Sequence, residues 1–112
     1  MTTSKKYKLK SEEIEQLIPK IGGCLATEKI TVEGEAIGYM YRENPDFKND
    51  SGWRFLSGSE NQDYVDNSEN WAIFDTNTIA NYDRTIIPYL ESPIESELER
   101  IKGTETFKLI ED

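Results

Sequence analysis

The chain has 112 residues, a length typical of one domain and long enough to bury a hydrophobic core without metals or disulfides. Its two Trp, six Tyr and four Phe residues supply much of that core and exclude a disordered chain. Nucleic acid and anionic membranes would repel the net charge of −9, so we expect neither as a partner. The charge would attract a basic protein partner, or it serves only to keep the protein soluble.

The first ten residues are basic, and we expect them to form a loosely ordered arm before a single domain over residues 11–112. No apolar run follows the arm and none reaches the ~20 residues that span a bilayer, so we expect a cytoplasmic protein. Ser11 can cap a helix in which Ile14, Leu17 and Ile18 share one face. Pro19 and the Gly22-Gly23 pair would end that helix.

Five segments have the composition of β-strands. Residues 24–32 and 36–42 flank Glu33-Gly34 and predict a hairpin. The other three predicted strands are residues 53–56, 71–74 and 107–109, the last of them at an edge of the sheet. The segments between the middle strands, residues 43–52 and 57–70, are polar and carry turn signals.

Short helical segments are expected near the C-terminus. Asp75 or Thr76 can cap a helical turn that reaches Tyr82, and residues 95–102 predict a short helix before Gly103. A proline interrupts residues 86–90, so their type stays open. The elements together predict an α+β fold: a mainly antiparallel twisted sheet of about five strands, an N-terminal helix and short C-terminal helical segments.

Few residue types suited to catalysis are present. The chain has no histidine and a single cysteine, Cys24, which excludes Ser-His-Asp and Cys-His sites, histidine-bound metals and an intrachain disulfide. Asp46-x-Lys48-x-Asp50 resembles the start of a calcium loop, but Lys48 occupies a ligand position and Ser57 stands where the bidentate Glu belongs. We therefore predict no metal, no cofactor and no enzyme, with paired carboxylates as the alternative route to catalysis. Cys24 is interpreted as a small buried hydrophobe.

The acidity is concentrated in the middle of the chain. Between Glu43 and Asp75 there are eight acidic and two basic residues, which contribute −6 of the total charge. There a turn delivers Trp53 and Arg54 into a strand, and Trp, Tyr and Arg dominate binding hot spots. Trp53 can equally be a core residue at the strand entry. The candidate partner-binding residues are Tyr41, Arg42, Glu43, Asp46, Asp50, Trp53, Arg54, Glu60, Asp63, Tyr64 and Asp66.

A series of motifs covers about residues 21–100. It begins with Gly-Gly-Cys-Leu-Ala-Thr at 22–27 and Ile-Gly-Tyr-Met-Tyr-Arg-Glu-Asn-Pro at 37–45. Asp-Ser-Gly-Trp-Arg-Phe at 50–55 and Gly-Ser-Glu at 58–60 follow, and Asn-Tyr-Asp at 81–83 and Ile-Pro-Tyr-Leu at 87–90 complete it. In this order the motifs resemble the DUF2185 family, also called Imm33, which is classed among the immunity proteins of bacterial polymorphic-toxin systems. The chain departs from the family's pattern at residues 95–100, where a Gly-Ser pair and an aromatic residue before Glu-Arg are expected.

The resemblance implies that the protein neutralises a toxin by direct protein–protein binding, and it brings no catalytic residues. The acidic loops fit a basic toxin domain, such as a nuclease, as the partner. We expect the protein itself to be a monomer or a weak homodimer. The alternative function is a housekeeping or regulatory protein-binding module that has no toxin partner.

Overall fold

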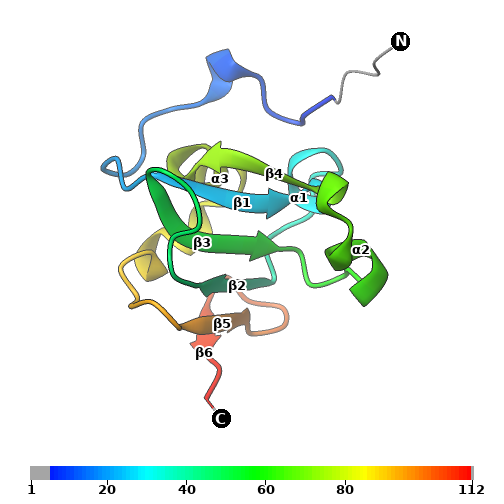
Figure 1. The fold of residues 1–112 in the computed structure, drawn as a ribbon, viewed down its shortest axis with the longest axis vertical. Helices are drawn as coiled ribbons and strands as arrows, with labels where there is room; N and C mark the ends of the chain where they lie inside the picture. Colours follow the sequence, from blue (N-terminus) through cyan, green and yellow to red (C-terminus); the bar gives the residue numbers. More distant parts are fainter. Residues whose placement is uncertain (1–5, 112) are drawn as a thin grey trace.

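A six-stranded mixed sheet organises the chain in the computed structural model, which describes residues 6–111 (Figure 1). The strands lie in the order β4-β1-β3-β2-β5-β6; β1 and β3 run parallel, and all other neighbouring pairs are antiparallel. The α+β class and the mainly antiparallel sheet are confirmed, with one parallel pair and one more strand than expected. The strands are β1 (Gly23–Thr27), β2 (Tyr39–Arg42), β3 (Asp50–Leu56), β4 (Trp71–Asp75), β5 (Glu97–Arg100) and β6 (Phe107–Leu109).

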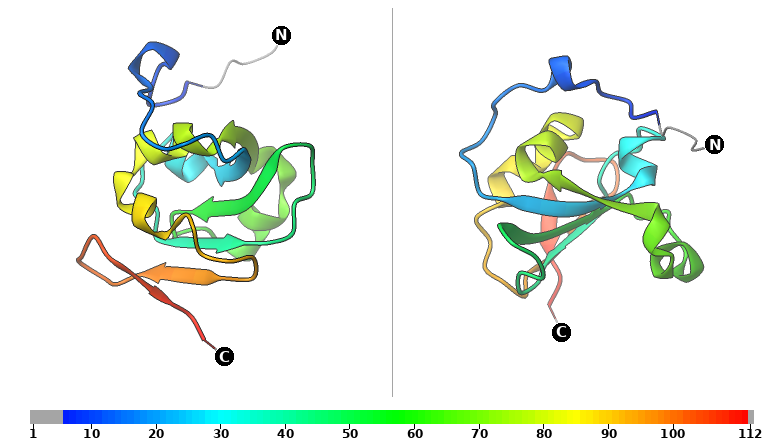
Figure 2. Two further views of the ribbon diagram at one scale, coloured as in Figure 1. Left: turned by 90° about the vertical axis from the view of Figure 1, so that its left-hand side faces the viewer. Right: turned by 45° about the horizontal axis from the view of Figure 1, so that its top comes forward.

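Short helices cover one face of this sheet. They are α1 (Glu28–Thr31), α3 (Thr76–Tyr82) and the 3₁₀ helix η3 (Arg84–Tyr89), which lie together in both views of Figure 2. The helical turn expected after the fourth strand is confirmed as α3, and its cap is Asp75, which accepts a hydrogen bond from the backbone N–H of Asn77 at 2.9 Å. The segment whose type was open, residues 86–90, lies mostly in η3.

The hydrophobic core fills the space between the sheet and these helices. Because side chains alternate along a strand, each strand sends every second residue into this core. Cys24, Met40, Trp53 and Phe55 are completely buried there, and the indole N–H of Trp53 donates to the carbonyl of Leu90 at 3.1 Å. The interpretation of Cys24 as a buried small hydrophobe is thereby confirmed.

The predicted N-terminal helix is wrong beyond its first turn. Only the 3₁₀ helix η1 (Ser11–Glu13) forms, and the chain then runs without regular structure to β1. The amide of Asn77 on α3 accepts hydrogen bonds from the backbone N–H groups of Leu17 and Ile18, at 2.8 and 3.2 Å. Its amide nitrogen donates to the carbonyl of Glu15 at 2.9 Å. Side chains from another element therefore bond the backbone groups that a helix would have paired internally.

The expected hairpin between residues 24–32 and 36–42 is also wrong. The first strand ends at Thr27, and residues 28–31 form α1, which buries Ile30 completely. Packing of Ile30 into the core thus overrides the strand preference of the Ile-Thr-Val run. Gly34 does turn the chain with a positive φ of 77°, but the turn joins α1 to β2, and β3 lies between β1 and β2 in the sheet.

The helix predicted over residues 95–102 is a strand, β5. Glu95 has a positive φ of 82°, which is incompatible with a right-handed helix starting there. Leu98 is buried while Glu97 and Glu99 flank it on the opposite face of the sheet, so the acidic and apolar residues follow a period of two. A segment this short fits both the helical period of 3.6 residues and the strand period of two, and pairing with β2 selects the strand.

Residues 6–10 of the predicted arm lie against the rest of the chain. The N–H of Lys8 donates to the carbonyl of Thr31 at 2.8 Å, and the ring of Tyr7 meets that of Phe74 edge-on, with 5.6 Å between centroids. Residues 1–5 lie outside the described residues. The division into a loose arm and one domain over 11–112 stays a prediction.

Candidate partner-binding face

No helix of residues 6–111 lies over the centre of the sheet face opposite α1, α3 and η3 (Figure 1), and we call this the open face. It is turned toward the viewer in Figure 1, with α1 and α3 behind the strands. Strand register places one row of side chains across five strands on this face. The row consists of Ile73, Leu25, Arg54, Tyr41 and Glu97.

A groove of 630 Å³ lies on the open face, between the loop of residues 43–49 and helix α2 (Gln62–Asp66). Its floor is apolar, and one side chain of this floor, Ile73 on the edge strand β4, is 60% exposed. Acidic side chains stand on both sides of this floor, Glu43 on the loop and Asp66 on the helix. The full lining is Leu25, Tyr41, Glu43, Arg54, Val65, Asp66, Ser68, Trp71, Ala72 and Ile73.

A bulge in β3 shapes the first wall of the groove. Gly23 of β1 pairs with Asp50, but Leu25, two residues later, pairs with Arg54, so β3 holds two extra residues over this stretch. Gly52 lies inside the bulge with a φ of +91°, and a Cβ atom there would stand 2.2 Å from the carbonyl oxygen of Glu43. Only glycine fits this position. The Asp-Ser-Gly-Trp motif is therefore the sequence of the bulge.

The bulge brings Asp50 and Arg54 together in a buried ion pair. Nη1 and Nη2 of Arg54 donate to the two carboxylate oxygens of Asp50 at 3.0 and 2.7 Å, and the two side chains are 1% and 0% exposed. The backbone N–H groups of Asp46 and Gly52 donate to the same carboxylate, each at 2.8 Å. Burial alone would raise the pKa of Asp50, but the hydrogen bonds from Arg54 and from these backbone groups hold it below its usual value.

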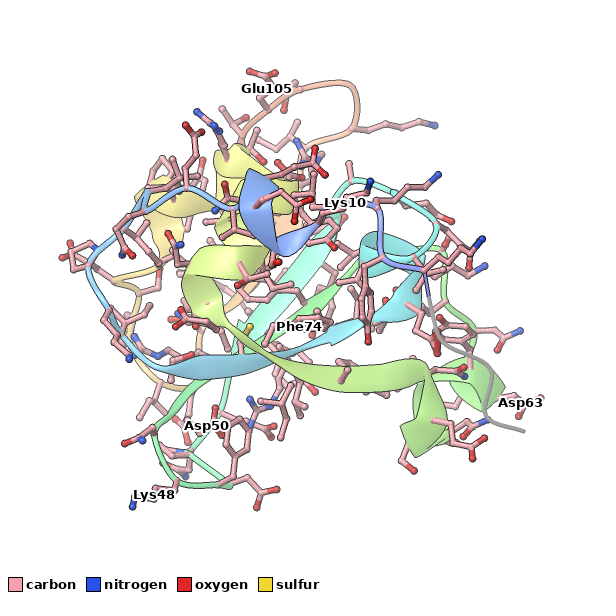
Figure 3. The ribbon with its side chains drawn as sticks, turned by 90° about the horizontal axis from the view of Figure 1, so that it is seen from above. Lys10, Lys48, Asp50, Asp63, Phe74 and Glu105 are labelled. Carbon is pink, nitrogen blue, oxygen red and sulfur yellow. The ribbon has the colours of Figure 1, made fainter. Side chains whose placement is uncertain are left out.

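The loop of residues 43–49 is fastened to the open face by the same arginine. Nε of Arg54 donates to Oε2 of Glu43 at 2.5 Å, and the ring of Phe47 lies 5.8 Å from the guanidinium. Glu43 keeps 49% of its side chain exposed, so its carboxylate faces both the arginine and solvent. Figure 3 shows Asp50 and Lys48 on the opposite side of the sheet from Lys10 and Glu105.

Helix α2 forms the second wall, and the polar segment 57–70 is ordered around it. The side chain of Asn61 caps α2 by accepting from the N–H of Tyr64 at 2.8 Å. The indole N–H of Trp71 donates to the carbonyl of Val65 at 2.9 Å, which fixes the tryptophan ring against the helix. A second short helix, the 3₁₀ helix η2 (Ser68–Asn70), leads directly into β4. Both walls are therefore held by hydrogen bonds to the sheet.

Glu60 organises the turn that leads to α2. Its carboxylate accepts hydrogen bonds from the hydroxyl of Thr27 at 2.6 Å and from the backbone N–H groups of Ser57 and Gly58 at 2.8 and 2.9 Å. Burial acts to raise the pKa of Glu60, but these bonds lower it below the usual value. Glu60 thus has a structural role in the turn.

The structure brings together four of the predicted partner-binding residues in the groove: Tyr41, Glu43, Arg54 and Asp66. Asp50 lies buried beneath them. The other six lie elsewhere. Asp46 and Asp63 are exposed on the loop and on α2, Glu60 lies in the turn before α2, and Tyr64 lies under the ammonium of Lys29 at 5.5 Å.

Arg42 and Trp53 belong to the side of the sheet that faces the core. Trp53 is completely buried, which supports its interpretation as a core residue at the strand entry. Arg42 lies 5.6 Å from the Trp53 ring and donates to the carbonyls of Ser51 and Ser92, at 2.9 and 2.8 Å. These bonds leave neither side chain free to anchor a partner in this structure.

Sequence reasoning missed the apolar floor of the groove, which is built by Leu25, Trp71 and Ile73. One sequence feature does indicate this floor. Residues 24–26 and 71–74 are apolar at consecutive positions, whereas a strand with one solvated face normally alternates apolar and polar residues. Apolar side chains on both faces indicate a second contact surface.

The described residues, 6–111, contain no group of three or more His, Cys, Asp or Glu side chains that could hold a metal ion. Within the same range, no helix is long and apolar enough to cross a membrane.

A fixed sheet face that combines an apolar floor with acidic walls is suited to binding a protein partner. The chain belongs to the family described as the Imm33 immunity protein domain, whose model matches residues 24–111. The matched range contains both walls and the floor of the groove, and it confirms the resemblance found in the sequence motifs. Membership indicates an immunity-type role with a protein as the kind of partner. Neither the curated proteins nor the solved structures contain a match to this chain.

Proposed function

We propose that the protein neutralises a bacterial toxin by binding it directly, and that the open face of the sheet is the surface that meets the toxin. The observation that carries this proposal is the match of residues 24–111 to an immunity protein family. The groove supports the choice of surface, because it combines exposed apolar area with fixed walls, as the centres of protein interfaces do.

The charge distribution supports a basic toxin domain as the partner. Residues 43–75 contribute −6 of the net charge of −9, and this segment supplies both walls of the groove. An acidic surface attracts a basic protein from a distance and raises the rate of association, an effect that salt reduces. A complex formed in this way should associate more slowly as the salt concentration rises.

The proposal predicts a toxin gene beside the gene of this chain, and the test is co-expression of the chain with that toxin domain. We expect growth to be rescued, and the two purified proteins to form a complex in size-exclusion chromatography and in calorimetry at low and high salt. The toxin expressed alone and the toxin with an unrelated acidic protein are the controls. If the chain neither rescues growth nor forms a complex, toxin neutralisation is wrong and the alternative of a housekeeping module gains support.

A further inference from the structure

We propose that the groove on the open face receives a lysine or arginine side chain of the partner. The aliphatic stem would lie on the floor at Leu25 and Ile73, and the cationic head would lie between the carboxylates of Glu43 and Asp66. This inference rests on the proposed function and adds to it the chemistry of the group that enters the groove.

The floor suits the stem of a long basic side chain. Ile73 is 60% exposed and Leu25 is half-buried beside it, so apolar area is open to solvent on the floor of the groove. Lysine and arginine bury their methylene groups along such surfaces while the charged head stays near polar groups. The aromatic rings of Tyr41 and Trp71 also line the groove, and the faces of such rings attract a cation.

The charges at the groove favour a cationic side chain of the partner over an anionic or an apolar one. Arg54 uses four N–H groups on Glu43, on both oxygens of Asp50 and on the carbonyl of Trp53. Arg54 is the one cation among these groups, and with the three carboxylates of Asp50, Glu43 and Asp66 it leaves the groove a net charge of −2. A carboxylate or phosphate group would be repelled by Glu43 and Asp66, and a purely apolar group would remove both carboxylates from water without supplying a cation.

A second copy of this chain is a poor occupant for the same reason. In a two-fold symmetric dimer the same patch meets itself, which would bring Glu43 and Asp66 of one copy against those of the other. Like charges facing each other across an interface oppose association.

The walls of the groove are set before any partner arrives. The loop is fixed by the bonds of Arg54 to Asp50 and Glu43, and α2 is fixed by the bond from Trp71 to Val65. A fixed site spends little ordering entropy on binding, so a single inserted side chain can contribute strongly to affinity.

Two pairs of matched variants test the proposal in the complex with the toxin domain. Glu43→Gln with Asp66→Asn removes both groove charges but keeps the shape, and Glu12→Gln with Glu105→Gln removes two exposed charges elsewhere on the chain. We expect calorimetry to show about tenfold or greater weakening for the groove pair and a change within about twofold for the control pair. Ile73→Ser should also weaken the complex, whereas Ile101→Ser, at a residue 42% exposed beyond the groove, should not.

Equal effects of the groove pair and the control pair would overturn the inference while leaving toxin neutralisation intact. If no complex with the toxin forms, NMR titration with short peptides tests the inference independently. The peptide acetyl-Leu-Arg-Leu-amide should shift the backbone amide NMR signals of Leu25, Tyr41, Trp71 and Ile73, and acetyl-Leu-Glu-Leu-amide should not. If the arginine peptide shifts no signals, or shifts those of acidic residues outside the groove equally, the inference is wrong.

Discussion

Asp50 and Arg54 stand four residues apart on one strand, yet their side chains form a two-point ion pair with distances of 3.0 and 2.7 Å. Four residues of a regular strand span about 13 Å, which is too far for such a pair. The bulge at Gly52 places two extra residues between their pairing positions and so shortens the distance between the two residues. One backbone irregularity thus supplies the ion pair, and the ion pair in turn holds the loop that forms a wall of the groove.

Replacing Arg54 should strongly destabilise the fold. Arg54→Met leaves the buried carboxylate of Asp50 without its cation, and removing one partner of a buried pair costs about 3–5 kcal/mol of unfolding free energy. The control is Arg84→Met, which breaks the exposed pair with Glu15 and should cost at most about 1 kcal/mol. Urea unfolding followed by circular dichroism measures both. Equal losses for the two variants would show that the Asp50–Arg54 pair does not hold the loop.

Stability should fall at acid pH because of Asp50. Its pKa is lower in the folded than in the unfolded chain, so its contribution is complete above the unfolded value of about 3.9 and is lost as the pH falls through the folded value. The lowered pKa of Glu60 acts in the same direction. The chain has no histidine, so we expect a nearly constant unfolding free energy between pH 5 and 8 and a decline below about pH 4.

Asp50→Asn provides the matched comparison for this pH dependence. The amide keeps the shape but cannot titrate, so the wild-type protein should be more stable than the variant at pH 7 and lose that advantage as the pH falls. Unfolding free energies at a series of pH values give the difference directly. A difference that stays constant down to pH 2 would contradict the lowered pKa of Asp50.

The sequence predicted what depends on neighbouring residues and missed what depends on distant ones. The cap of α3 at Asp75 follows from local hydrogen bonding, and the edge strand at Phe107 and Leu109 follows from alternation. In residues 15–18, by contrast, backbone groups that a helix would pair internally are bonded by Asn77, which lies some 60 positions later in the chain. The local pattern of apolar residues around positions 15–18 could not predict that contact, because it depends on a residue far away in the sequence.

The candidate site likewise contains features that neighbouring residues predict and features that depend on distant ones. The tryptophan of the Asp-Ser-Gly-Trp motif and the arginine that follows it are residue types that indicate an interface. The motif builds a bulge, and because side chains alternate along the strand, Trp53 faces the core and Arg54 faces the open face. Leu25 and Ile73 become part of the same groove only through the pairing of β1 with β4, which the predicted hairpin did not contain.

Removing the Asn77 side chain should release the N-terminal segment. Asn77→Ala deletes three hydrogen bonds to residues 15–18 and leaves the partly buried N–H groups of Leu17 and Ile18 unpaired. We expect faster hydrogen exchange at these two amides and a loss of about 1–3 kcal/mol of unfolding free energy. Asn81→Ala is the control, because Asn81 bonds only Glu15 in this segment and its loss should speed exchange at Glu15 alone. Unchanged hydrogen exchange at Leu17 and Ile18 would show that the Asn77 side chain does not hold this segment in place.

The two tryptophans should behave oppositely, because Trp53 lies in the core and Trp71 lines the groove. In Trp71→Phe the remaining Trp53 should emit at short wavelength and resist quenching by acrylamide, a neutral quencher that the acidic surface does not repel. In Trp53→Phe, Trp71 should be quenched readily, and the protein should lose stability with the Trp53–Leu90 hydrogen bond and with core volume, by roughly 1–3 kcal/mol. Binding of a partner in the groove should then protect Trp71 from acrylamide and leave Trp53 unaffected. If Trp53 is the tryptophan that a partner protects, the open face is not the binding surface.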